Sequence, residues 1–146
     1  MIIFINFPQL RKVALIMCEE FIAHVRKNDD GTWTEPHRLS DHLDNTARLA
    51  ENYAAKFNSG EWGKAAGLAH DAGKGRLVWQ KYLELKSGYG RYDEEAHLEG
   101  KTGKIPRAIH GAKLVEDLYG KGLGRFLVYC IAGHHAGLPD WPPRKK

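Results

Sequence analysis

The sequence contains little cysteine: its 146 residues include only two, Cys18 and Cys130, which lie far apart and form no CxxC pair. This spacing argues against a disulfide framework and against a zinc site built from thiolates. Because free thiols persist in a reducing compartment, we expect the protein to act in the cytoplasm.

Long hydrophobic runs are also absent. The opening segment MIIFINFPQLRKVALIM is apolar, but Pro8 and the Arg11-Lys12 pair interrupt it, and no basic region precedes it. It is too short and too interrupted to be a signal peptide or to cross a bilayer, so we expect no membrane partner. Residues 1–16 are predicted to be an N-terminal extension that lies outside the functional core.

Length and charge set broad limits. A chain of 146 residues suits one domain with a hydrophobic core and is too short for two ordinary domains. The content of 42% hydrophobic and 27% charged residues is that of a globular protein, which argues against disorder. The net charge of +4 suits a polyanionic partner but is weak evidence by itself.

Periodic apolar residues predict a succession of helices with a poor strand signal. Residues 41–57 repeat apolar side chains every three or four positions after Ser40, a suitable N-cap, and Asn58-Ser59-Gly60 ends the pattern. Residues 87–106 have no clear period and are predicted to be a surface loop. Further helices are predicted over residues 62–72, 77–86, 107–120 and 124–137, which together indicate an all-α fold.

Several of the eight histidines fall in these helical segments, where they could converge. Neutral imidazole and carboxylate oxygen form a ligand set that suits Mn, Fe, Co, Ni or Zn. Neighbouring residues on a helix point about 100° apart, so the pairs His70-Asp71 and His134-His135 would each flank an ion from two sides, which favours a binuclear site. The candidate metal ligands are His42, His70, Asp71, His110, His134 and His135.

Simpler interpretations compete with this one. A single histidine on an apolar face is usually a packed core residue, and His24, His37 and His97 are predicted to be of that kind, without a functional partner. Lys74 is either an ordinary exposed lysine or a phosphate contact beside the metals. Trp79 is expected to pack in the core, although Trp79, Tyr82, Tyr89 and Tyr92 are the candidates for stacking with single-stranded bases.

The segments SDHLDNTARLA, GLAHDAGK, WQKYL, AIHGA and AGHHAGLPD together resemble the HD-domain nuclease of type I CRISPR systems. The resemblance runs from about His24 to Asp140 and implies an HD-domain helical bundle over residues 17–146. The family's domain continues beyond the LPD turn, so we expect this chain to lack its C-terminal helices.

The resemblance also implies roles for individual residues. His42 would be the first metal ligand, and His70 with Asp71 the defining dyad, with Asp71 bridging two ions. The second ion and the substrate side would be served by His110, His134 and His135. The predicted catalytic residues are Asp71 and Lys74, and Lys74 would stabilise the phosphate or orient the attacking water. The implied cofactors are two divalent ions, Mn, Fe, Co or Ni, with Mg possible.

The activity implied is endonucleolytic and exonucleolytic degradation of single-stranded DNA in antiviral defence, with a superfamily 2 helicase and the CRISPR surveillance complex as partners. Two alternatives remain open from the sequence. One is an HD phosphohydrolase acting on a nucleotide or cyclic nucleotide, which would need a closed pocket for the base. The other is a catalytically incomplete HD fragment that serves as an interaction module and holds structural metals.

Overall fold

The computed structural model describes residues 21–90 and 107–138, except 123 and 136. This part of the chain is mostly helical, as the periodicity predicts. Its elements, in chain order, are β1 (Ile22–His24), β2 (His37–Arg38), α2 (Leu39–Ala55), α3 (Gly60–Ala69), the short 3-10 helix η1 (Ala72–Gly75), α4 (Leu77–Ser87), α5 (Ala108–Tyr119) and α6 (Gly124–Gly133).

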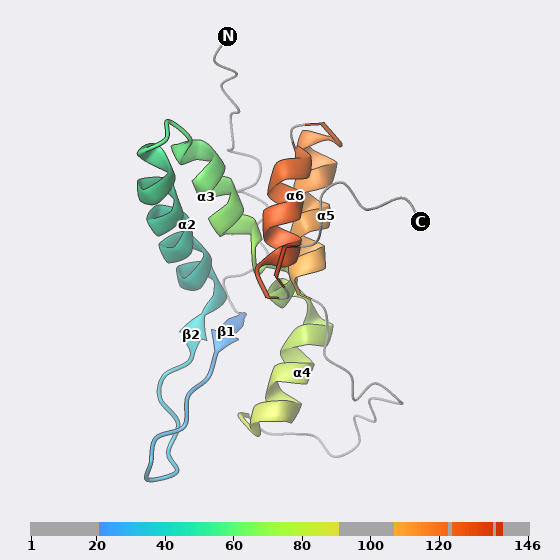
Figure 1. Ribbon diagram of the computed structural model, residues 1–146. Helices are drawn as coiled ribbons and strands as arrows, with labels where there is room; N and C mark the ends of the chain where they lie inside the picture. The colour runs from blue at the N-terminus through green and yellow to red at the C-terminus, as the bar shows by residue number, and fades with distance from the viewer. Residues whose placement is uncertain (1–20, 91–106, 123, 136, 139–146) are drawn as a thin grey trace.

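Two helical hairpins form the body of the described structure. α2 packs against α3, and α5 packs against α6, with α4 extending from the end where the two hairpins meet (Figure 1). The small β1-β2 ladder is antiparallel and lies next to the start of α2. The all-α prediction is therefore confirmed for the helices, and the two short strands are an addition that the sequence did not indicate.

Small residues let the helices approach one another closely. A Cβ atom at Gly67 would lie 2.5 Å from the Cα of Ala47, which shows that α3 packs almost backbone to backbone on α2. A Cβ at Gly111 would overlap the carbonyl oxygen of Ala69, so the first turn of α5 lies directly against the end of α3. The main core joins the four hairpin helices through Ala47, Ala65, Leu68, Ala69, Ala112, Val115, Leu127 and Ile131.

The predicted helix boundaries need two corrections at the places where the histidines lie. The helix expected over 62–72 ends at Ala69, and the chain turns at Asp71, whose φ of −118° is not helical, before η1 begins. The helix expected over 124–137 ends at Gly133, so His134 and His135 follow it. The expected N-cap Ser40 lies inside the first turn of α2.

Some expectations concern residues outside this part of the chain. The extension at residues 1–16, the domain start at Met17, and most of the loop predicted over 87–106 lie outside the described residues, as do His97 and Tyr92. Among the described residues, no helix combines the length and apolar character that crossing a bilayer requires.

Candidate metal centre

Five of the predicted ligands lie close together where the two helical hairpins meet. His42 lies in the first turn of α2, His70 directly follows α3, and Asp71 directly precedes η1. His134 and His135 come directly after α6. Loops and helix ends bring these side chains together, so the convergence depends on how the hairpins pack and not on a single helix face.

Asp71 is the common member of two groups with the spacing of metal ligands. In the first group, the Nε2 atoms of His42 and His70 lie 3.4 and 3.5 Å from Oδ2 of Asp71 and 3.1 Å from each other. In the second, the Nε2 atoms of His134 and His135 lie 3.7 and 3.6 Å from Oδ1. Each carboxylate oxygen thus faces its own pair of imidazoles, as a bridging carboxylate would.

Backbone carbonyls orient one histidine in each group. Nδ1 of His70 lies 2.7 Å from the carbonyl oxygen of Gly67, and Nδ1 of His134 lies 2.6 Å from that of Ile131. A carbonyl can only accept, so both Nδ1 atoms carry a hydrogen, and both Nε2 atoms are directed at Asp71. Metal-binding histidines are oriented by hydrogen bonds of this kind.

Asp71 is buried, and each of its carboxylate oxygens lies near a cation of the chain: Lys74 at Oδ2 and Arg107 at Oδ1. Oδ1 accepts no hydrogen bond from the described residues, so its contact with Arg107 is an ion pair alone. A carboxylate oxygen has two lone pairs, and a cation is the partner that such an oxygen and nearby imidazole nitrogens favour. The residues present therefore fit a divalent transition metal.

Electrostatics keep these groups in the states that metal binding needs. Burial alone would raise the pKa of Asp71, but the hydrogen bonds from His42 and Lys74, and the charge of Lys74, lower it well below its ordinary range. Burial lowers the pKa of His70, with the hydrogen bond to Gly67 opposing. Metal ligands must be deprotonated, so an ionised Asp71 and a neutral His70 are ready to bind.

Lys74 is buried, in contrast to an ordinary exposed lysine. Its Nζ lies 2.9 Å from Oδ2 of Asp71 and 3.3 Å from the carbonyl oxygen of Ala23, and the side chain is 2% exposed. Burial lowers its pKa, with the carboxylate of Asp71 opposing. The contact that the structure shows is with Asp71 and not with the surface, so Lys74 holds and neutralises the carboxylate, whereas a direct phosphate contact stays a prediction.

The prediction that His24 has no partner in the site is wrong, and His37 makes ring contacts there, although neither belongs to a ligand group. Nε2 of His24 lies 3.2 Å from Nζ of Lys74, and its ring centroid is 4.9 Å from that of His42. The His37 ring lies 5.6 Å from the His42 ring. Burial, followed by the charge of Lys74, lowers the pKa of His24 to about 4. The β1-β2 ladder thus adds two imidazoles beside the first group.

The structure does not bring His110 to Asp71. His110 belongs to neither ligand group, and its Nε2 instead contacts the guanidinium of Arg76. The residue that reaches the centre from this part of the chain is Arg107, which immediately precedes α5. Its Nε lies 3.2 Å from Oδ1 of Asp71 and donates a 2.9 Å hydrogen bond to Nε2 of His135. No pattern in the sequence singled out Arg107.

A second residue that the sequence analysis missed is Gln80, in the WQKYL segment. Its amide nitrogen donates to the carbonyl oxygens of Ile22 and Lys74 at 3.0 and 2.8 Å, and its Oε1 accepts from the backbone of Ile22. Gln80 therefore ties β1 to the segment carrying the dyad. Its neighbour Trp79 is 4% exposed, which confirms that it packs in the core, and Nζ of Lys74 lies 5.4 Å from its ring centroid.

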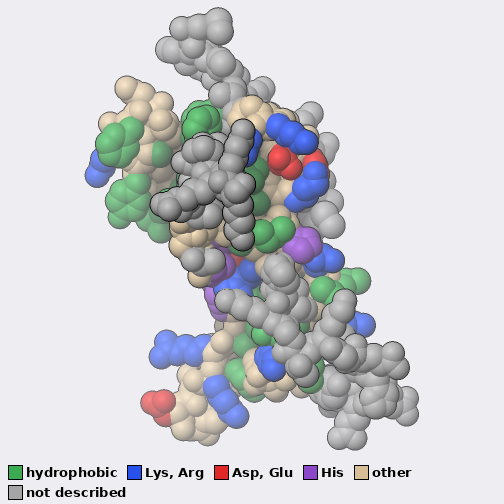
Figure 2. All heavy atoms as spheres, turned by 45° about the vertical axis from the view of Figure 1, so that its right-hand side comes forward, with side chains coloured by type: hydrophobic (Ala, Val, Ile, Leu, Met, Phe, Trp, Pro, Cys, Tyr) green, Lys and Arg blue, Asp and Glu red, His purple; other side chains and the backbone are tan. Residues whose placement is uncertain are grey.

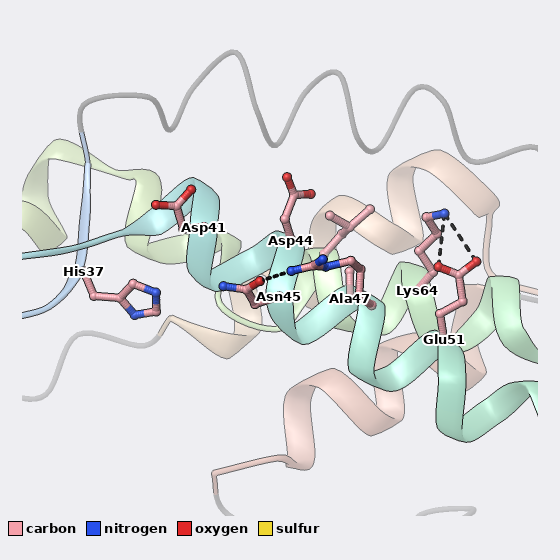
Figure 3. Close-up of a pocket in the computed structure, with 9 residues that line it drawn as sticks. His37, Asp41, Asp44, Asn45, Ala47, Glu51 and Lys64 are labelled. Carbon is pink, nitrogen blue, oxygen red and sulfur yellow. Dashed lines mark hydrogen bonds and ion pairs between the residues drawn. The ribbon is translucent and has the colours of Figure 1, made fainter.

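A separate cavity of about 700 Å³ lies along α2, with His37 at one end (Figure 3). Its walls carry the carboxylates of Asp41, Asp44 and Glu51. Glu51 forms an ion pair with Lys64 across the cavity wall, drawn as dashed lines in Figure 3. None of the residues that line it belongs to the two ligand groups, so this cavity is distinct from the candidate metal centre.

Comparisons with known proteins add no identification to this geometry. No family model matches the chain, and no curated protein or solved structure matches it. The function is therefore argued from the site and from the motifs in the sequence.

Proposed function

We propose that the protein is a metal-dependent phosphodiesterase that degrades single-stranded DNA in the cytoplasm, as its resemblance to the HD-domain nuclease of type I CRISPR systems implies. The observation that carries this proposal is the orientation of His70 and His134. Both are held by backbone carbonyls with Nε2 directed at the buried carboxylate of Asp71. A histidine that only fills a core has no need of an Nε2 atom held against an ionised carboxylate, whereas a metal ligand beside a shared carboxylate does.

The chemistry follows from the residues that surround Asp71. The chemistry that a divalent ion would supply here is a hydroxide nucleophile near neutral pH, because binding to the ion would lower the pKa of a water molecule. His42, His70 and Asp71 would hold this ion. Lys74 keeps Asp71 ionised through its 2.9 Å contact, and Arg107 provides a second positive charge on the other side of the carboxylate. Fixed cations of this kind stabilise the negative charge that builds on a phosphate as it is attacked.

The surface around the site supports an anionic substrate. Histidine side chains reach the surface in the narrow middle part of the molecule, with Lys and Arg side chains beside them (Figure 2). Near the β1-β2 hairpin, Trp33 and Tyr89 form an edge-to-face pair with centroids 5.4 Å apart, and Nζ of Lys27 lies 5.5 Å from the Trp33 ring. Aromatic rings next to cations are the usual platform for single-stranded bases. A superfamily 2 helicase and the CRISPR surveillance complex are the proposed partners that would deliver the strand.

The nucleotide phosphohydrolase alternative would need a pocket for the base next to the metal centre. An apolar pocket of about 270 Å³ lies there, and His70, His134 and Ile131 are among the residues that line it. The 700 Å³ cavity along α2 contains neither ligand group. The cleavage experiment below distinguishes this alternative from the nuclease.

The test is cleavage of a circular single-stranded DNA by the purified chain with Mn²⁺, which excludes nucleases that need an end. We expect cleavage that EDTA abolishes and that Asp71→Ala lacks. Asp117→Ala is the matched control, because it removes an exposed carboxylate of α5 that forms an ion pair with Lys113 and belongs to neither ligand group. Cleavage that persists in EDTA or in Asp71→Ala would contradict the proposal. Metal binding without cleavage would favour the interaction module, and hydrolysis of nucleotides alone would favour the phosphohydrolase.

A further inference from the structure

The second ligand group is already engaged by a cation that belongs to the chain. A metal ion between Asp71, His134 and His135 would need Oδ1 of Asp71 and the Nε2 lone pair of His135. The guanidinium of Arg107 contacts both: its Nε donates to Nε2 of His135 at 2.9 Å and lies 3.2 Å from Oδ1. An arginine side chain stays charged at every accessible pH, so it cannot give way by losing a proton.

The first group is arranged differently. Lys74 contacts Oδ2 of Asp71, but a carboxylate oxygen has two lone pairs and can accept this bond while it binds an ion. The Nε2 atoms of His42 and His70 face each other at 3.1 Å, and no lysine or arginine donates to either of them among the described residues. Both imidazoles are therefore available to one ion, whereas the imidazole of His135 is occupied by Arg107.

The charge balance favours one ion over two. The described ionisable groups within 4 Å of the Asp71 carboxylate are two cations, Lys74 and Arg107, and four imidazoles. The two cations already oppose its single negative charge. Two divalent ions would share this single carboxylate while one of them lay against a guanidinium. Like charges at such short range in a partly buried site repel strongly.

The backbone of Arg107 is held firmly in place. A Cβ atom at Gly73 would overlap the carbonyl oxygen of Arg107, so η1 packs directly against this residue. Its side chain is 24% exposed, so it is not closed off from solvent. The guanidinium itself is held by Asp71 and His135 through its Nε, and its remaining N–H groups can bind the oxygens of a phosphate.

We propose that Arg107 takes the place of the second metal ion: the centre binds one divalent ion at His42, His70 and Asp71, and the guanidinium supplies the second positive charge toward the phosphate of the substrate. This inference rests on the proposed function for the substrate but makes its own statement about the number of ions. It departs from the two ions that the resemblance implies.

The experiment counts the ions that the full chain binds. Metal-free protein is dialysed against saturating Mn²⁺, bound manganese is measured by elemental analysis, and the electron paramagnetic resonance spectrum distinguishes single ions from exchange-coupled pairs. We expect one uncoupled ion in the wild type and in Arg107→Lys, which keeps the cation. We expect a second ion and a coupled spectrum in Arg107→His, which removes the charge and adds a ligand, and none in Asp71→Ala.

Arg107→Ala is a second variant that removes the cation from the second ligand group, for the case that Arg107→His does not fold. Circular dichroism shows whether each variant is folded. Two coupled ions in the wild type or in Arg107→Lys would overturn the inference, as would a single ion in both Arg107→His and Arg107→Ala. Neither result would affect the proposed nuclease activity. A wild-type chain that binds no ion would instead overturn the proposed function, and the inference with it.

Discussion

Replacing Lys74 with methionine should strongly destabilise the metal-free protein. Nζ of Lys74 lies 2.9 Å from Oδ2 of Asp71, and the two side chains are 2% and 5% exposed. At this distance, and with an effective dielectric constant of about 20, the attraction is about 6 kcal/mol. Part of it offsets the cost of burying the ammonium, and Arg107 remains as a cationic partner of Asp71. The expected loss in the free energy of unfolding is therefore at most about 3–5 kcal/mol, the cost of removing one partner of a buried ion pair.

Urea unfolding in EDTA measures this loss, and a double-mutant cycle assigns it to the pair. Asp71→Asn removes the other charge, and the double variant should lose less stability than the two single variants added together, by at least about 1 kcal/mol. Mn²⁺ should raise the melting temperature of Lys74→Met more than that of the wild type, because the ion then replaces a missing cation. Additive effects, or a loss in Lys74→Met below about 1 kcal/mol, would refute the reasoning.

Two further changes test the packing and the protonation of the site. Gly111→Ala should lower the free energy of unfolding by about 1–3 kcal/mol or more, because its Cβ would overlap the carbonyl oxygen of Ala69. Gly122→Ala is the matched control, since a Cβ there meets nothing within 4 Å. Equal melting temperatures of the two variants would contradict the packing described. The metal-free protein should also lose stability as the pH falls from about 6.5 to about 4, because the lowered pKa of His24, about 4, means that the unfolded chain binds more protons over this window. His24→Gln should flatten this part of the profile of urea midpoint against pH, and an unchanged slope would exclude His24 as its cause.

The helices could be predicted because their apolar residues recur with the period of a helix, and their ends could be predicted less well. The pattern through Leu68, Ala69 and Ala72 continues across the dyad, so the sequence gives no sign that the helix stops at Ala69. The break comes from packing: the end of α3 lies against the first turn of α5, where Gly111 has no side chain to prevent the contact. A contact between segments about 40 residues apart cannot be read from a local pattern.

The short strands were missed for a related reason. Three residues in β1 and two in β2 are too few to display an alternating pattern. Their pairing is held by contacts with distant residues, notably the hydrogen bonds between Gln80 and the backbone of Ile22. Because the ladder places His24 beside Lys74, missing the strands also meant missing two imidazoles near the centre.

Residue type explains both the success and the failure within the site itself. The motifs drew attention to five side chains that the structure brings together, because imidazole and carboxylate are rare enough, in pairs, to be noticed. The same reasoning favoured His110 over Arg107, although only Arg107 contacts Asp71. An arginine before a helix looks like an ordinary surface residue, and only the position of the hairpins shows that its guanidinium reaches a buried carboxylate and the lone pair of His135. Sequence could therefore indicate which atoms can bind a cation, whereas the three-dimensional arrangement decides which of those atoms already have one.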